Sequence, residues 1–190
     1  MTKAAIIDID NTLWQFCDAF YEELKKTNPA FPPVEQWTEW DFFRPYCTED
    51  QFMAAVDVIH FQQDSDRYRP YHESKGFLQT LKKQGYRVVI ASHRREEARR
   101  PTEQWLRKHE LVHDELHLSF DKTVLFGTAS LVVDDSPQAL EKAVASNAIG
   151  AGLLFPWNKA YTGNGFGLFR DLNEVLRYIM NRKGNKKYKL

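Results

Sequence analysis

The stretch that most constrains the fold of this chain is a short apolar run near the N-terminus, Ala4-Ala5-Ile6-Ile7, which leads directly into Asp8-Ile9-Asp10. Four consecutive apolar residues, two of them β-branched, indicate a strand that is buried on both faces. Strands of that kind belong to parallel sheets, which present their ligands at the carboxyl ends of the strands. We therefore expect a functional edge of a sheet directly after residue 7.

The two aspartates at this strand end are expected to act together. Side chains alternate along a strand, so Asp8 and Asp10 leave the backbone on the same side while Ile9 turns into apolar packing. Two carboxylates so close repel each other unless a cation lies between them, and Mg²⁺ is a hard cation that prefers oxygen ligands. The alternative is a polar turn in which Asn11 and Thr12 satisfy local backbone groups.

Strands and amphipathic helices alternate through the rest of the chain after residue 71. Strands are predicted over 86–91, 116–118, 131–133 and 149–155, and helices over 75–84, 101–109, from 136 onward and over 172–180. This alternation predicts an α/β fold with a doubly wound, mostly parallel, Rossmann-like sheet. The segment 163–167 is predicted as a loop, and the chain from residue 182 onward as a frayed basic tail.

The block from residue 15 to residue 71 differs from the rest. It contains helical patterns over 13–24 and 49–61, with a segment rich in proline and aromatic residues between them, and it has no buried-strand signal. We interpret residues 15–71 as a small helical cap inserted after the first strand. Residues 1–14 and 72–190 then form the α/β core.

Composition limits the class of protein further. The chain has 190 residues and a formal net charge of zero, so it can form one domain core with an insertion and shows no bulk charge for nucleic acid or a membrane surface. No apolar stretch resembles a signal peptide or a membrane span, which predicts a cytoplasmic protein. Cys17 and Cys47 are not in a C-x-x-C pair, so two free thiols are expected.

Polar residues at several predicted strand ends form a possible site. Asp8 and Asp10 end the first strand, Ser92 follows the second, Lys122 precedes the 131–133 strand, and Asp134-Asp135 ends it. A doubly wound sheet brings these ends to one crevice, where carboxylates favour Mg²⁺ and Mg²⁺ favours phosphate oxygens. The pattern therefore predicts phosphoryl chemistry.

Each of these residues has an expected role. Asp8 is the proposed nucleophile that forms an aspartyl-phosphate, and Asp10 the general acid and base. Ser92 would donate a hydrogen bond to a phosphoryl oxygen, and Lys122 would stabilise negative charge in the transition state. The alternative for each residue alone is structural: a surface lysine, a turn serine or a pair of helix-capping aspartates.

The order Asp8-x-Asp10-x-Thr12, Ser92, Lys122 and Asp134-Asp135 resembles the four signatures of the haloacid-dehalogenase-like hydrolase superfamily. More narrowly, the segments 120–124, 131–135 and 153–158 resemble the 5′(3′)-deoxyribonucleotidase family, with Asp121-Lys122-Thr123-Val124 as the more specific piece. His93 after Ser92, and the longer spacing between Lys122 and Asp134, depart from the human-type members of that family.

This resemblance implies a Mg²⁺-dependent phosphomonoesterase, nucleotidase-like, that acts on nucleoside monophosphates beneath a helical cap. It implies metal ligands at Asp8, Asp134 and the backbone carbonyl of Asp10, with Asp135 behind them. It also places Phe16 where an aromatic ring packs on the base. The remaining candidates for substrate contact are Trp40, Phe43, His93 and Arg94, with Trp37 and Phe42 as further rings that could stack on a base.

Two alternatives stay open at this point. The same machinery could act on another small phosphomonoester, such as a sugar phosphate, or on the 3′ ends of nucleic acid. A non-catalytic receiver-like domain also holds a phosphate on an aspartate, although its acidic pair precedes that aspartate. The expected partner is a small phosphorylated substrate; no nucleic acid or membrane partner is expected, and a homodimer is left open.

Overall fold

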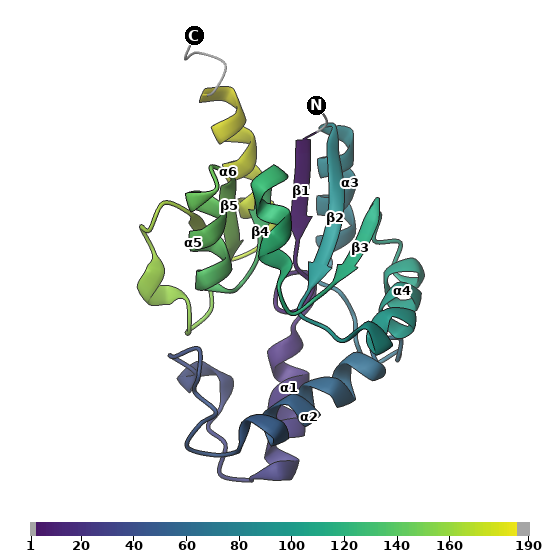
Figure 1. Ribbon diagram of the computed structural model, residues 1–190, viewed down its shortest axis with the longest axis vertical. Helices are drawn as coiled ribbons and strands as arrows, with labels where there is room; N and C mark the ends of the chain where they lie inside the picture. Colours follow the sequence, from purple (N-terminus) through teal and green to yellow (C-terminus); the bar gives the residue numbers. More distant parts are fainter. Residues whose placement is uncertain (1–2, 186–190) are drawn as a thin grey trace.

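The computed structural model describes residues 3–185 and contains one six-stranded sheet with all strands parallel, in the order β3-β2-β1-β4-β5-β6 (Figure 1). Its strands are β1 (Lys3–Ile7), β2 (Tyr86–Ser92), β3 (Glu115–Leu118), β4 (Ala129–Val133), β5 (Ile149–Leu153) and β6 (Gly167–Phe169). The predicted fold class, an α/β protein with a doubly wound parallel sheet, is confirmed. The order reverses next to β1, the position at which such sheets bind ligands.

Alternation along the strands divides the core into two apolar layers. In β1, Ala5 and Ile7 pack into the larger cluster, whereas Ala4 and Ile6 pack into the smaller one on the other face. The larger layer lies under α3 (Ser74–Lys83), α4 (Arg99–Lys108) and α6 (Leu172–Asn185), and the smaller under α5 (Pro137–Ala145) and the 3₁₀ segment η3 (Lys122–Thr128). Burial on both faces explains why these strands are continuously apolar.

Local signals in the sequence account for several element ends. Gly85 follows α3 with a φ of 80°, as a residue in the left-handed region after a helix should. The Ser136 hydroxyl accepts a hydrogen bond from the Ala139 N–H at the start of α5, where Pro137 is the first helical residue. Thr48 and Gln51 form a capping box at the start of α2 (Glu49–Phe61).

Near the C-terminus, one strand was missed and one sequence prediction was wrong. The predicted loop over 163–167 is present at residues 163–166, but Gly167 already belongs to β6, a strand over 167–169 that pairs with β5 and was not predicted. Three residues at a sheet edge are too few to show a strand pattern. Helix α6 continues to Asn185, so residues 182–185 are helical and not a frayed tail; residues 186–190 of that prediction lie outside the described residues.

A helical insertion follows β1, as predicted. It contains α1 (Phe16–Thr27), the 3₁₀ turn η1 (Val34–Gln36) and α2, and it forms the lower lobe in Figure 1. The chain enters and leaves this lobe at adjacent points, because the Tyr71 N–H donates to the Leu13 carbonyl. The boundaries 15 and 71 remain a prediction. Within residues 3–185, no helix combines the length and apolar character needed to cross a bilayer.

Candidate functional site

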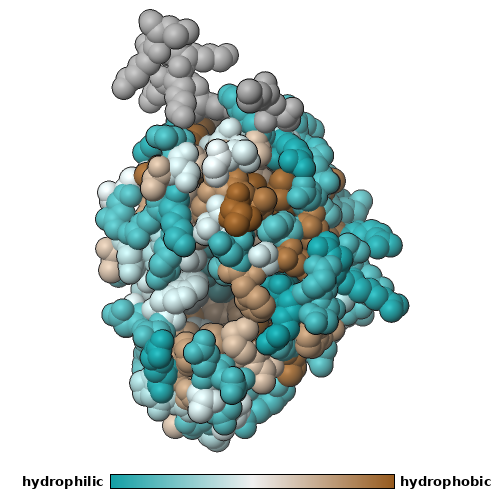
Figure 2. Space-filling model, viewed as in Figure 1, coloured by the Kyte–Doolittle hydropathy of each residue, from teal (hydrophilic) through white to brown (hydrophobic). Residues whose placement is uncertain are grey.

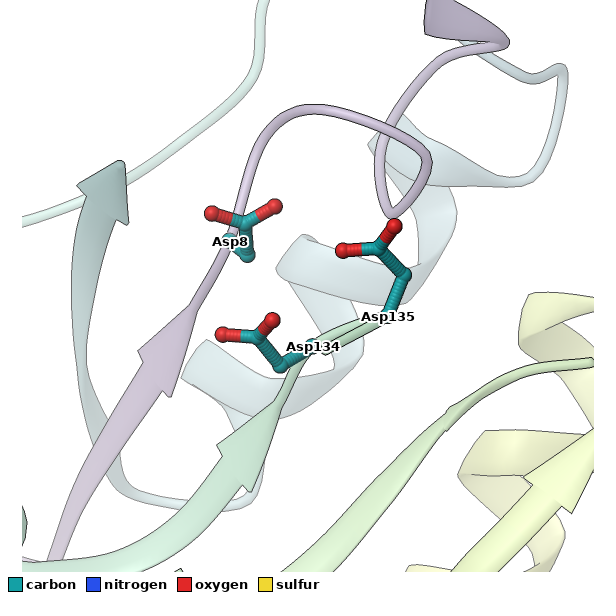
Figure 3. A group of neighbouring side chains, drawn as sticks. All are labelled: Asp8, Asp134 and Asp135. Carbon is teal, nitrogen blue, oxygen red and sulfur yellow. The ribbon is translucent and has the colours of Figure 1, made fainter. Parts of the chain in front are cut away.

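Three buried carboxylates face one another at the carboxyl ends of β1 and β4. Asp8 follows β1 and is held against β4 by a hydrogen bond from its N–H to the Val133 carbonyl, 2.9 Å long. Asp134 and Asp135 follow β4 directly. One carboxylate oxygen from each of the three aspartates lies within 4.8 Å of the others (Figure 3). The predicted convergence of carboxylates from two parallel strand ends is therefore present for these three aspartates, whereas the Asp10 carboxylate, predicted to join them, is not part of the group.

Lys122 places one positive charge among these acids. Its Nζ lies 2.6 Å from Asp8 Oδ1 and 2.6 Å from Asp134 Oδ2, and the side chain is buried. Burial by itself would lower the pKa of Lys122, but Asp134 and Asp8 outweigh it and raise that pKa above its usual range. The ammonium therefore stays charged at neutral pH.

One ammonium does not balance three carboxylates. Burial raises the pKa of Asp8 to about 7 against the opposing effect of Lys122, with Asp134 adding to the rise. Burial, followed by Asp134 and Asp8, also raises the pKa of Asp135 well above its usual value. Closely spaced buried carboxylates with too little positive charge fit a divalent cation with oxygen ligands.

Asn11 connects the loop after β1 to the acidic group. Its φ of 54° lies in the left-handed region, where asparagine is one of the few residues other than glycine that is tolerated. Its Nδ2 donates to Asp135 Oδ2 at 3.2 Å, and its Oδ1 accepts from the Cys17 N–H at the start of α1 at 3.0 Å. The first turn of the cap and the acidic pair are thus fixed by one side chain.

Asp10 turns toward a second polar group. Its carboxylate accepts hydrogen bonds from Arg94 Nη2 at 2.6 Å and from Trp14 Nε1 at 2.9 Å, and lies 3.0 Å from His60 Nε2. The hydroxyl of Ser92 is 3.4 Å from Asp10 Oδ2. Burial by itself would raise the pKa of Asp10, but Arg94 and His60 outweigh it and hold that pKa well below its usual range. Asp10 is ionised in this arrangement.

Arg94 does not line the cavity above the site, although it was predicted to contact substrate. Its guanidinium is fully buried behind Asp10 and also donates to Thr102 Oγ1 and Gln63 Oε1. The sequence prediction rested on its position two residues after Ser92 and did not anticipate a buried ion pair with Asp10. The structure thus makes Arg94 a partner of Asp10.

A cavity of about 330 Å³ lies between the cap and the strand ends. That volume is at the lower end of the range for small-molecule sites. Asp8, Asp10, Ser92, His93 and Lys122 line its floor together with the acidic pair. Its other wall is a group of apolar side chains that come mainly from the cap: Phe16, Phe20, Trp37, Trp40, Phe42, Phe43, Phe52, Met53 and Val56. Figure 2 shows the molecule hollowed between its two lobes.

Most of the candidate substrate contacts lie around the cavity. Phe16, Trp40, Phe43 and His93 line the cavity, as a contact role requires, although their roles remain a prediction. Trp37 and Phe42 stack on each other with ring centres 4.1 Å apart and planes within 11°. Trp37 is therefore used largely in the cap's own core, whereas Trp40 keeps 47% of its surface exposed.

His60 was missed at the sequence level. It lies at the end of α2, is 3% exposed, and brings a cap side chain onto Asp10 in the core. Burial and Arg94 lower its pKa against the effect of Asp10, so the ring is neutral. The sequence did offer one indication that His60 faces the site: it follows Phe52 and Val56 at intervals of four residues, which places all three on one face of the helix.

Solved structures with this fold come from several bacteria. A predicted phosphatase from Clostridium acetobutylicum is similar with a TM-score of 0.66 and 15% identity over 95% of this chain and 99% of that chain. A hydrolase of the haloacid-dehalogenase family from Deinococcus radiodurans R1, with bound phosphate and sodium, gives 0.63 and 14% over 96% of both chains. A predicted phosphoglycolate phosphatase from Haemophilus somnus 129pt gives 0.60 and 17% over 93% and 97%.

These comparisons show the fold. No protein-family model matches the sequence, and no curated protein matches it. The chain therefore has the haloacid-dehalogenase-like fold, with a six-stranded Rossmann-like sheet and a helical insertion after the first strand. The superfamily resemblance in the sequence is confirmed at the level of fold, and the narrower nucleotidase resemblance stays a prediction.

Proposed function

We propose that this protein is a Mg²⁺-dependent phosphomonoesterase that works through an aspartyl-phosphate on Asp8. The observation that carries the proposal is the buried group of Asp8, Asp134 and Asp135 with Lys122 on the floor of a cavity between the cap and the strand ends. Mg²⁺, held by Asp8, Asp134, Asp135 and the backbone carbonyl of Asp10, would neutralise phosphoryl oxygens when bound. The donor set is all oxygen, as that ion requires.

The residues of the chain divide the remaining work. A carboxylate oxygen of Asp8 forms a bond to phosphorus while the ester oxygen leaves with the bonding electrons; water then breaks the acyl-phosphate and releases Asp8. Lys122 and the hydroxyl of Ser92 would stabilise charge on the phosphoryl oxygens. The two short contacts of Lys122 with Asp8 and Asp134 support this role.

Asp10 is the proposed proton-transfer residue. It reaches the cavity floor, and its carboxylate is ionised by its pair with Arg94. An ionised carboxylate can take a proton from the attacking water at once. To protonate the leaving oxygen, it must first take up a proton, so we expect the base step to be the more effective of its two roles.

The substrates we propose are (deoxy)nucleoside monophosphates. A volume of about 330 Å³ admits a small molecule, and the cap covers the crevice against the ends of nucleic acid chains. Phe16 and the exposed ring of Trp40 offer faces on which a base could stack. A cavity wall made mainly of rings and hydrocarbon favours this class over a sugar phosphate, because a base offers a flat face that can stack on the rings and a sugar does not.

Phosphate release from a panel of nucleoside monophosphates, with and without Mg²⁺, tests the proposal. The Asp8→Asn protein is the key variant, because it keeps the shape of the side chain but lacks the nucleophile. We expect it to release no phosphate. Asp18→Asn, on the outer part of α1 and outside the cavity lining, is the matched control and should act like the wild type. Full activity of Asp8→Asn would overturn the mechanism.

A further inference from the structure

The charges around the cavity are divided unevenly between its floor and its cap. The floor carries Lys122, the lysine that contacts Asp8 and Asp134. On the cap side, the only charged residue lining the cavity, among the described residues, is Glu39. Glu39 is exposed and lies beside Trp40 at the turn that follows η1.

Two arginines that lie over rings lining the cavity, Arg44 over Phe43 and Arg95 over Phe120, are already paired with acids. Arg95 lies over the ring of Phe120, but its Nε is 2.9 Å from Asp57 Oδ2. The Arg44 guanidinium lies 2.9 Å from Asp41 in the same way. Of the arginines and lysines that the structure describes, only Lys122 lines the cavity, so an anionic group on the cap side would meet no unpaired cation there.

The two rims of the cavity carry exposed rings. Trp40 from the cap is 47% exposed, and Phe120 from the loop after β3 is 58% exposed, although both line the cavity. Rings that face a cavity from both sides suit a flat apolar group and cannot satisfy the hydration of a second anion. The apolar wall of the cavity and the negative charge of Glu39 at its rim therefore both disfavour a substrate with a second anionic group.

We propose that the cap selects phosphomonoesters whose leaving group is uncharged and carries a flat ring, and rejects those that carry a second anionic group, with Glu39 setting the charge selection. The inference rests on the proposed function and adds a specificity residue to it. It predicts that a nucleoside monophosphate is accepted in preference to a diphosphate, and that esters with a carboxylate on the leaving group are poor substrates.

Phenyl phosphate and 4-carboxyphenyl phosphate form the decisive pair, because they differ by one carboxylate on the same ring. A single charge at about 4 Å in a water-like medium changes kcat/KM by about fivefold, and we expect the wild type to favour phenyl phosphate by at least this factor. The preference should weaken at high ionic strength, because an exposed charge is screened.

Variants of the rim then assign the selection. Glu39→Gln should lower the ratio of the two kcat/KM values about fivefold, and Glu39→Lys should shift it by on the order of 25-fold, because repulsion becomes attraction. Glu35→Gln is the matched control: Glu35 is also an exposed cap glutamate but does not line the cavity, so the ratio should stay at the wild-type value. A ratio that Glu39→Lys leaves unchanged would overturn the assignment.

Binding separates this inference from the proposed function. The Asp8→Asn protein with Mg²⁺ is titrated with each ester, and tryptophan fluorescence reports binding, because Trp37, Trp40 and Trp157 line the cavity. If Asp8→Asn binds phenyl phosphate more tightly than 4-carboxyphenyl phosphate, and Asp8→Asn/Glu39→Lys does not, the charge selection by Glu39 is supported. This holds even if the wild type hydrolyses neither ester, because the lack of hydrolysis would refute only the proposed phosphatase activity. Equal binding of both esters by Asp8→Asn would refute the selection even if hydrolysis is observed.

Discussion

Replacing Arg94 by methionine tests whether the ion pair behind the cavity stabilises the fold. Methionine keeps an apolar stem of similar length but removes the guanidinium, which donates to Asp10 Oδ1 at 2.6 Å and Oδ2 at 3.3 Å. Removing one partner of a buried pair costs about 3–5 kcal/mol. Because Asp10 is 19% exposed and can be partly hydrated, we expect about 3 kcal/mol, or a fall in Tm of about 6–12 °C.

The assay is equilibrium unfolding in urea, with the free energy of unfolding extrapolated to water. Arg95→Met is the matched control. Arg95 is the next residue, but it is half exposed and pairs with Asp57 at the surface, so its loss should lower the free energy of unfolding by only about 0–1 kcal/mol. If the two variants lose the same stability, the buried pair is not what stabilises this region.

The pH dependence separates the charge on Asp10 from lost packing. In the wild type the pKa of Asp10 is held well below its usual range. The ionised carboxylate therefore contributes fully to the free energy of unfolding above about pH 4, and this contribution is lost only as the pH falls through the low pKa of Asp10 in the folded protein. Without Arg94, burial should raise that pKa, so the folded variant takes up a proton before the unfolded chain does. The difference in free energy of unfolding between the wild type and Arg94→Met should therefore become smaller as the pH falls from 7 to 5. If this difference stays constant over the same pH range, the lost stability comes from packing and not from the charge on Asp10.

Three further predictions follow from the structure. A Cβ on Gly152 would lie 2.0 Å from the Asp134 carbonyl oxygen, so Gly152→Ala should displace Asp134 and Asp135 and abolish phosphate release. A Cβ on Gly76 would meet open space, so Gly76→Ala should be at least as stable as the wild type and fully active. Burial raises the pKa of the Cys17 thiol far above its usual range, so iodoacetamide at pH 8 should alkylate Cys47 before Cys17. Peptide mass spectrometry measures the labelling of each cysteine, and equal labelling of the two would contradict the prediction. A chelator should abolish phosphate release and lower Tm, and Mg²⁺ at about 100 times its Kd should restore about 2.7 kcal/mol; a Tm indifferent to Mg²⁺ would exclude the proposed metal site.

Much of the architecture was predictable because local chemistry and the global fold agree. The apolar run before Asp8 reads as a strand buried on both faces, and Gly85 and Ser136 mark helix ends that the structure confirms. Parallel strands share one carboxyl edge, so residues as distant in sequence as Asp8 and Asp134 had to approach each other once the strand order was right. The short strand β6 escaped prediction because edge pairing leaves little pattern in three residues.

The orientation of individual side chains was not predictable in the same way. Asp8 and Asp10 share a strand side by alternation, yet Asp8 contacts Lys122 whereas Asp10 turns to Arg94 and to His60 of the cap. Nothing in the spacing of Arg94 indicates whether it faces solvent, substrate or a buried carboxylate. Only the packing of α2 against the core decides this, because it excludes water from the guanidinium.

The amino-acid sequence by itself determined which residues end the strands, and with them the acids that meet at one edge of the sheet. It did so because strand periodicity and parallel pairing act locally and repeat along the chain. The tertiary structure alone decided how the cap covers that edge, which charges it leaves unpaired and which it buries. Those properties depend on contacts between segments whose distance and orientation no local pattern encodes.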